Sequence, residues 1–332
     1  MKKSMIGGQA VLEGVMMKAP EAMAIAVRRE DGTIDLTTSK LTPAKHRYPI
    51  LKLPVLRGII AFGESMVLGV KSIMTSAEMY GSDEAEQYKP SKFDAFIAQK
   101  TGRSLEDVAI FFALVIAIIF VVGMFIVLPA LAAGFLRTRI SSHVLVNVFE
   151  GLVRLTLFLI YIVSISRMKD IKRVFEYHGA EHKTIHCYEH DEELTVENAR
   201  KYPTLHPRCG TAFLLIVMVI SIFIFSFLGW QNIFVRMASR LALLPLVAGL
   251  SYEVIRLAGK SDAPLVKAVI YPGLLLQRLT TREPDDKQLE VAICAFKAAM
   301  ATCGEDMPYA DKESVLDGGT CCGAAAAQGG RG

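Results

Sequence analysis

Long apolar runs dominate the middle of this chain. The segment Val108 to Leu136 contains no charged residue, and as a helix rising 1.5 Å per residue it exceeds the thickness of a bilayer core of about 30 Å. Three further runs follow, the first of them interrupted by Glu150 and Arg154: Val144–Ile165, Cys209–Val235 and the shorter Leu241–Leu257. The pattern therefore predicts four transmembrane helices.

The region before these runs has a different pattern. Residues Met23–Arg28 and Thr33–Ser39 flank a Glu30-Asp31-Gly32 turn and predict a β-hairpin. Leu53 to Met79 then shows helical periodicity, but its uncharged stretches are too short to cross a bilayer. We expect this segment to form an interfacial or partly re-entrant helix.

Together these elements predict a predominantly α-helical polytopic membrane protein with about four transmembrane helices and a small cytoplasmic α+β part. We expect residues 1–50 to form a cytoplasmic region with the hairpin, and residues 51–104 to form the interfacial helix and a linker. The four-span domain is expected at 105–258, with a His-rich segment at 166–211. A cytoplasmic helical region at 259–316 and a disordered tail at 317–332 follow.

Composition and charge narrow the class of protein. Of the 332 residues 52% are hydrophobic, and the net charge of +4 is too small and too scattered to predict nucleic-acid binding. Lys and Arg concentrate between the second and third expected spans, at Arg167, Lys169, Lys172, Arg173, Lys183, Arg200, Lys201 and Arg208. The positive-inside rule then predicts a cytoplasmic-membrane protein with both termini in the cytoplasm, where its six cysteines stay reduced.

Four histidines in this basic segment are spaced four residues apart. His178, His182, His186 and His190 form one slowly winding stripe on an α-helix, because each step of four drifts by only about 40°. Glu181 flanks this stripe. Imidazole and carboxylate together are ligands for zinc or iron. The stripe therefore predicts a site for a divalent metal, with zinc expected and iron or manganese as alternatives.

Two short motifs refine this metal hypothesis. His178, Glu181 and His182 match the pattern H-x-x-E-H, in which two histidines bind zinc and the glutamate is the general base. His206 and Cys209 lie just before the third expected span and would supply a further ligand from the same membrane face. The alternative interpretations are interfacial histidines that form hydrogen bonds or contact lipid headgroups, and a small buried Cys209.

A lone acidic residue in the apolar N-terminal segment is a further candidate. Glu13 lies in GGQAVLEGVMMK among three glycines, which indicates close backbone packing around one carboxylate. It is a candidate ligand or base for the histidines. The other interpretation is a strand or loop that packs on the cytoplasmic part.

Four segments resemble one known family. GGQAVLEGVMM, YHGAEHKTIHCYE, HPRCGTAFLL and LQRLTTREPDDKQLEVAI are similar, in this order, to the YqhQ-like family of bacterial membrane proteins. The resemblance covers nearly the whole chain except the tail. It implies a bacterial multi-pass membrane protein from a domain family of unknown function, described as a predicted metal-dependent enzyme, and it supplies no substrate or reaction.

Three functions are compatible with these features. The leading hypothesis is a metal-dependent hydrolase that acts on a lipid or membrane peptide at the cytoplasmic face, with metal ligands from His178, His182, His186, His206 and Cys209 and with Glu181 or Glu13 as base. A second is a non-catalytic factor for membrane-protein assembly or insertion, which would dock membrane lipids or membrane-protein partners. A third is a metal or haem carrier, although the chain contains no C-x-x-C-H motif.

Overall fold

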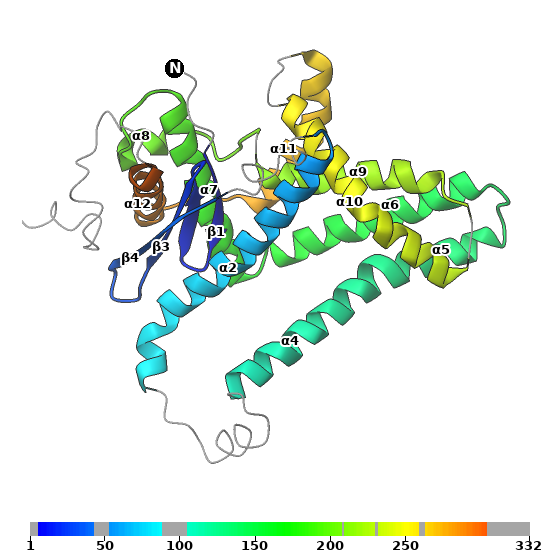
Figure 1. Ribbon diagram of the computed structural model, residues 1–332, viewed down its shortest axis with the longest axis horizontal. Helices are drawn as coiled ribbons and strands as arrows, with labels where there is room; N and C mark the ends of the chain where they lie inside the picture. The colour runs from blue at the N-terminus through cyan, green and yellow to red at the C-terminus, as the bar shows by residue number, and fades with distance from the viewer. Residues whose placement is uncertain are drawn as a thin grey trace, which may run out of the picture. The chain divides into compact units, whose positions relative to one another are not determined.

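The computed structural model describes residues 6–42, 53–87, 105–207, 209–229, 232–258 and 263–303 (Figure 1). The expected tail at 317–332 and Arg208 lie outside the described residues. By internal contacts the chain forms two compact units. Unit 1 contains Met1–Tyr80, Val163–Val217 and Pro245–Gly332, and unit 2 contains Gly81–Ile162 and Met218–Leu244.

Unit 1 contains an antiparallel sheet in the order β1-β2-β3-β4. The strands are β1 (Gly7–Val11), β2 (Gly14–Lys18), β3 (Ala22–Arg28) and β4 (Ile34–Lys40). The last two form the hairpin expected around Gly32, whose φ of 89° favours glycine. The first two form another hairpin, whose two-residue turn holds Glu13 at a φ of 48°.

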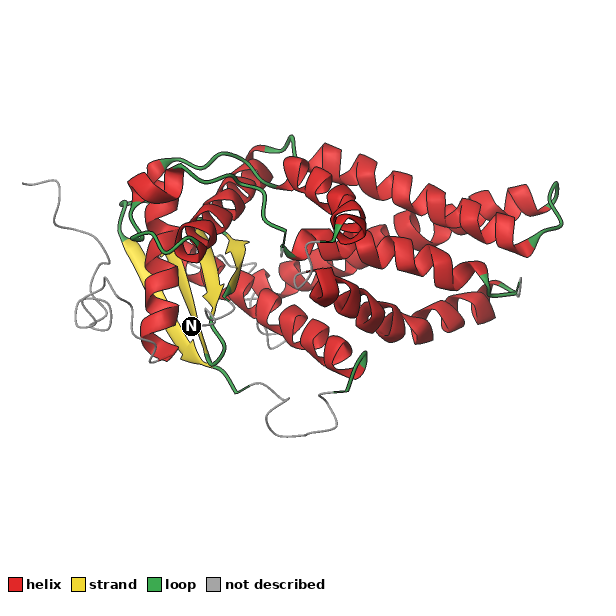
Figure 2. Cartoon of the chain, turned by 90° about the horizontal axis from the view of Figure 1, so that it is seen from above, coloured by secondary structure: helices red, strands yellow, loops and turns green. Residues whose placement is uncertain are grey.

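Both faces of the two central strands, β2 and β3, are buried. Successive side chains of a strand point to opposite faces, so these strands contribute to two cores. Val15, Met17, Ala24 and Ala26 pack on one face in a core shared with α7 (Lys169–Glu189) and α12 (Asp286–Cys303). Val11, Met16, Met23, Ile25 and Val27 pack on the other face with Leu68, Met79 and Tyr80 of α2 (Leu56–Gln87). Figure 2 shows the strands as one layer beside the helices.

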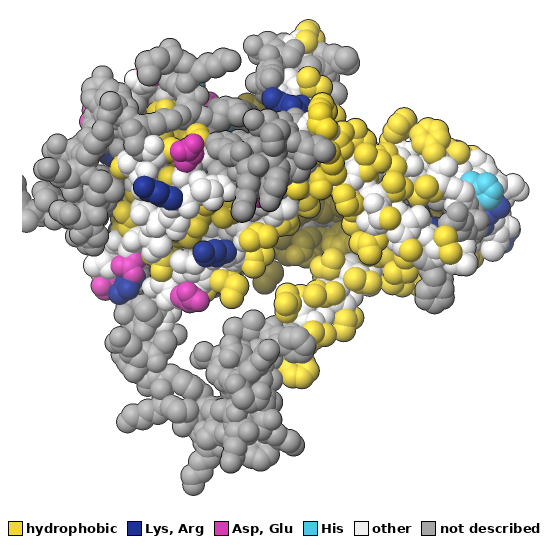
Figure 3. All heavy atoms as spheres, viewed as in Figure 1, with side chains coloured by type: hydrophobic (Ala, Val, Ile, Leu, Met, Phe, Trp, Pro, Cys, Tyr) yellow, Lys and Arg dark blue, Asp and Glu magenta, His cyan; other side chains and the backbone are white. Residues whose placement is uncertain are grey.

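The remaining elements are helical. They are α4 (Leu105–Val122), the π-helix η2 (Gly123–Val127), α5 (Leu128–Arg137), α6 (His143–Ile165), α8 (Val196–Arg200), α9 (Gly210–Ser226), α10 (Ile233–Ala258) and α11 (Pro264–Thr280). Hydrophobic side chains gather on α4 and α10 (Figure 3). The fold is therefore mostly helical with one small antiparallel sheet, as the sequence predicts.

Within the described residues, four helical segments are long and apolar enough to cross a membrane: Leu56–Gly81, Phe112–Arg137, His143–Ile165 and Val235–Leu257. The number agrees with the prediction, but the set differs. The helix expected over Cys209–Val235 is the shorter Gly210–Ser226, and Leu56–Gly81 qualifies although its uncharged stretches are short. The charged residues of Leu56–Gly81 are Arg57, Glu64, Lys71 and Glu78, each seven residues from the next. They divide the helix into short uncharged stretches, but they are too few to lower its mean hydropathy below that of a span.

Unit 2 contains a buried charge cluster around Glu150, whose side chain is 1% exposed. The expected pair with Arg154 forms at 3.1 Å within α6. Two arginines of α10 join it: Arg240 Nη2 donates to Glu150 Oε2 at 2.9 Å, and Arg236 lies 3.9 Å away. The sequence pattern predicted the pair but not these partners, because they come from a distant helix.

Candidate metal centre

Three histidines of the stripe, His178, His182 and His186, lie on α7, which continues unbroken from Lys169 to Glu189, and His190 is the residue that follows this helix. Gly179 in its middle has a packing role, because a Cβ there would lie 2.0 Å from the carbonyl oxygen of Arg282. The Arg282 backbone N–H donates to Phe175 O of the same helix at 2.9 Å. Gly179 thus lets the segment that follows α11 lie directly against the histidine helix.

This close approach orients the first histidine. The Nδ1 of His178 lies 2.8 Å from the carbonyl oxygen of Thr280, and since a carbonyl can only accept, Nδ1 carries the proton. The Nε2 of the same ring then presents its lone pair and lies 3.1 Å from the Sγ of Cys209. Metal-ligating histidines commonly donate their second nitrogen to a backbone carbonyl in this way.

The second histidine is oriented by the same kind of contact. His182 is buried, and its Nδ1 donates to the carbonyl oxygen of Thr204 at 2.5 Å. Burial lowers the pKa of His182 below its ordinary value, so the ring is held neutral, although the nearby Cys209 and the Thr204 carbonyl oppose this shift. A neutral imidazole is the form that binds a metal.

His178, His182 and Cys209 thus form one group of potential ligands. Their donor atoms all lie within 4.8 Å of one another. Ligands at tetrahedral positions around one zinc ion are about 3.3–3.8 Å apart, given bonds of about 2.0–2.3 Å. Small side-chain movements would therefore bring these three donor atoms within bonding distance of one ion. Two imidazoles and one thiolate form a ligand set that suits zinc.

A second group lies beside the first and consists of His186, Glu189 and His206. The Nε2 of His186 donates to Leu205 O at 2.9 Å, which leaves Nδ1 as its free acceptor. Burial lowers the pKa of His186 to about 4. The ring centroids of His186 and His206 are 4.5 Å apart, and those of His182 and His206 are 5.6 Å apart, so the two groups are adjacent.

His206 is held mainly through its backbone. Its N–H donates to the Oε1 of Gln277 at 2.9 Å, and its carbonyl accepts from the Nε2 of the same side chain at 2.8 Å. Both residues are buried. The side-chain amide of Gln277, which lies in α11 (Pro264–Thr280), thus fixes the loop that carries His206 and Cys209. His190, the last histidine of the stripe, belongs to neither group, and its Nδ1 donates to His186 O at 2.8 Å.

The two candidate catalytic carboxylates lie outside both groups. Glu181 is buried, and burial raises its pKa above the ordinary value. It packs against Gly8 of β1, where a Cβ would approach Glu181 Cγ to 2.8 Å. Glu13 forms an ion pair with Arg173 and accepts from the Tyr177 hydroxyl at 3.4 Å. The expected delivery of Glu13 to the histidines is thus replaced by a contact with the first half of α7.

Several residues of this site were missed by sequence reasoning. Glu189 is one residue before His190 in the sequence, but its pairing with His206 at 3.4 Å requires the tertiary fold. The carbonyl oxygens of Thr204 and Thr280 leave no pattern in the sequence, since any residue has one. Gln277 had a weak signal, because it lies in the fourth motif that resembles the known family.

The residues that the structure describes form a mostly helical fold with four helices of membrane-spanning length and a cluster of His and Cys donors. The chain belongs to the family described as "Protein of unknown function (DUF1385)", whose model matches residues 53–302. It is 39% identical over 298 residues to "Uncharacterized protein YqhQ" of Bacillus subtilis (strain 168), which covers 87% of this chain and 90% of that protein. The expected family resemblance is therefore confirmed. No solved structure matches the chain.

Proposed function

We propose that this chain is a zinc-dependent membrane hydrolase whose metal is held by His178, His182 and Cys209. The observation that carries the proposal is the convergence of three donor atoms within 4.8 Å, two of them on imidazoles whose other nitrogen donates to a backbone carbonyl. Such prior orientation reduces the entropy lost on binding an ion. Bound at this site, zinc would polarise a carbonyl or phosphoryl oxygen and activate water for hydrolysis.

The second group would complete the site. His186, Glu189 and His206 lie next to the three ligands and offer further acceptors for a metal or for a substrate proton. Glu181 remains the candidate general base, because its raised pKa would bring a carboxyl group closer to neutrality, where proton transfer is efficient. Glu13 is better suited to positioning α7, since its carboxylate pairs with Arg173.

The substrate would be a lipid or a membrane peptide at the cytoplasmic face. Cys209 lies immediately before α9, an apolar helix, so the donors are next to a segment suited to the bilayer. In this proposal α4–α5, α6, α9 and α10 are the four spans, and the basic residues around α7 keep the site and both chain ends in the cytoplasm.

Metal content tests this proposal. The full-length protein, purified in detergent and reconstituted with zinc, should retain about one ion per chain, and the His178→Ala/His182→Ala double variant should lose it. His190→Ala is the matched control, because this histidine immediately follows the same helix and belongs to neither donor group. Zinc retained by the double variant, or equal loss in His190→Ala, would refute the assigned ligands.

Complementation of a deletion strain separates the hydrolase from a non-catalytic scaffold. The hydrolase requires His178 and His182 but tolerates charge reversal at Lys169 and Lys172, which lie at the exposed start of α7. A scaffold that docks anionic lipid or a partner through its basic residues would show the opposite sensitivity.

A further inference from the structure

The position of α2 relative to a bilayer follows from the packing of unit 1. The sheet, α7 and α12 share one buried core. Arg28 of β3 also donates to Lys287 O of α12 at 3.0 Å. These elements must therefore lie on the same side of any membrane. Between β4 and α7, and again between α7 and α12, the chain must cross that membrane an even number of times.

In the part of the chain between β4 and α7 that the structure describes, three helical segments are apolar and long: Leu56–Gly81, Phe112–Arg137 and His143–Ile165. Only an even number of them can cross. Phe112–Leu136 has no charged residue, whereas Leu56–Gly81 has Arg57, Glu64, Lys71 and Glu78. The segment that does not cross is therefore Leu56–Gly81. Between α7 and α12 the number of crossings must also be even. Val235–Leu257 and the uncharged Gly210–Ser226 are therefore the two segments that cross there.

The second half of α2 is held by the sheet. Ser72 and Ser76 are fully buried, and the hydroxyl of Ser76 accepts the backbone N–H of Leu12 at 3.2 Å. Gly69 lies so close to Gln9 of β1 that a Cβ there would meet its Oε1 at 2.7 Å. This half cannot enter the middle of a bilayer without carrying the sheet with it.

The first turns of α2 contact the helices proposed to span. Arg57 Nε donates to Glu253 of α10 at 2.7 Å, and the Phe62 ring lies 5.6 Å from that of Phe213, near the start of α9. Gly58 packs against Gly249 and Tyr252 of α10. The helix thus starts beside the ends of two spans and continues to the sheet.

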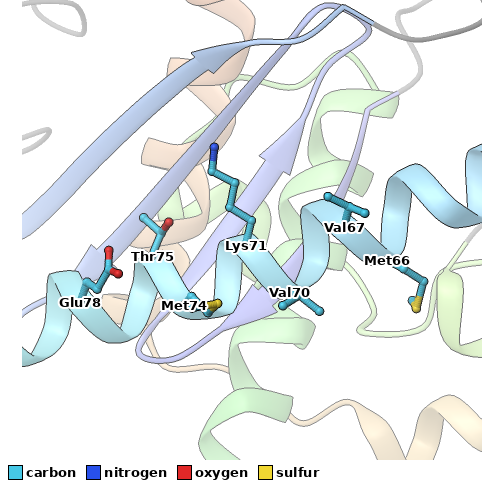
Figure 4. Close-up of a pocket in the computed structure, with 7 residues that line it drawn as sticks. All are labelled: Met66, Val67, Val70, Lys71, Met74, Thr75 and Glu78. Carbon is cyan, nitrogen blue, oxygen red and sulfur yellow. The ribbon is translucent and has the colours of Figure 1, made fainter. Parts of the chain in front are cut away.

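A third face of α2 is apolar and exposed. Met66, Val67, Val70, Ile73 and Met74 are each at least 50% exposed, and at 100° per residue they fall within an arc of about 120°. Lys71 and Glu78 border this arc. Figure 4 shows Lys71, Thr75 and Glu78 pointing to one side of the helix and Met66, Val70 and Met74 to the other, along an open hollow of about 590 Å³.

We propose that α2 lies in the plane of the bilayer surface, on the side of the His–Cys cluster, with this apolar arc inserted among the lipid acyl chains. The inference rests on the four-span part of the proposed function. An interfacial helix inserts its apolar face by about 5–10 Å and keeps its charged border at the headgroups. The lipid surface is the expected occupant because the arc is continuous with a helix whose first turns pack on the spans.

Tryptophan quenching by brominated lipids tests this orientation. Trp230 is the only tryptophan of the sequence, so a Trp230→Phe background allows single tryptophans at Met66, Val70 or Met74 in the full-length protein in phosphatidylcholine vesicles. In a crossing helix, residues 66 and 74 would differ in depth by about 12 Å. In an in-plane helix all three should lose fluorescence equally to lipids brominated near the glycerol, and less to lipids brominated near the chain end.

Two control variants make every outcome informative. Lys71→Trp should be quenched by aqueous iodide, and Ile118→Trp, in α4, should be quenched by the deeply brominated lipid. A depth that changes steadily from residue 66 to 74 would overturn the proposal in favour of a span. Iodide quenching at all three positions, or shielding from both quenchers, would overturn it in favour of an aqueous face or a protein partner. If Ile118→Trp is not quenched by lipid, the four-span proposal itself fails.

Discussion

The substitution Gly179→Ala tests whether the close contact at the middle of α7 builds the site. Helix propensity alone favours alanine by about 1 kcal/mol. The added Cβ, however, would lie 2.0 Å from Arg282 O, where real contacts are not below 3.0 Å, so that carbonyl must move by about 1 Å. Overpacking of this kind costs about 1–3 kcal/mol. We therefore expect a net loss of stability, of up to about 2 kcal/mol.

The same movement should weaken metal binding. Arg282 is two residues from Thr280, whose carbonyl accepts from His178 Nδ1 at 2.8 Å. A shift of about 1 Å, carried back along the chain to Thr280, would take this contact beyond hydrogen-bonding distance. Loss of such an orienting contact typically lowers metal affinity about 10–100-fold. Zinc affinity, measured by competition with a chelating dye, should therefore fall while the His and Cys ligands are unchanged.

Gly63→Ala is the matched control for this experiment. Gly63 is also in a helix of unit 1, but a Cβ there would meet no atom within 4 Å. We expect this variant to melt at or above the wild-type temperature and to bind zinc normally. The reasoning is refuted if Gly179→Ala behaves like Gly63→Ala in both thermal unfolding and zinc affinity.

Further measurements test the roles of three residues on or near α7: Glu181, Gln277 and Cys187. Glu181→Gln should keep its zinc in elemental analysis, because Glu181 lies outside both donor groups, but should not complement a deletion strain; loss of zinc would make it a ligand. Gln277→Leu leaves the buried backbone N–H and C=O of His206 without the Gln277 amide, which should destabilise the fold by about 1–3 kcal/mol per group. Thermal unfolding measures this loss, and an unchanged melting temperature would show that the contact is dispensable. Burial raises the pKa of Cys187 from 9.0 to about 11, so the fold favours the neutral thiol and stability should fall as pH rises from about 9 to about 11. Alkylation of Cys187, followed by mass spectrometry, should be slow at pH 8 in the folded protein, and rapid alkylation there would contradict its burial.

Local patterns predicted much of the candidate site. A spacing of four residues placed the histidines on one face of a helix, and the motif before α9 supplied His206 and Cys209, both of which belong to the donor groups. Separating these donors into two groups needs tertiary distances. The four-residue spacing also includes His190, although this residue follows the end of α7 and belongs to neither donor group. Periodicity alone does not show where the helix ends.

The fold was predictable in class but not in assembly. The Glu30-Asp31-Gly32 turn predicts one hairpin, whereas the Leu12-Glu13 turn between β1 and β2 lacks the Asn-Gly or Asp-Gly pair that marks a two-residue hairpin turn. That helices cover both sides of the sheet is also a property of the fold. Likewise, the charged residues of α2 favour an interfacial helix over a span, but the contacts that hold it against the sheet, α9 and α10 come only from the fold. These features depend on contacts between residues far apart in the chain.

X-ray absorption at the zinc edge of the reconstituted full-length protein tests the proposed metal centre most directly. The proposed ligands predict one sulfur at about 2.3 Å and two imidazole nitrogens at about 2.0–2.1 Å. Cys209→Ser should remove the sulfur signal. A shell of oxygen and nitrogen only, or a sulfur signal that persists in Cys209→Ser, would contradict the assignment of His178, His182 and Cys209 as the ligands.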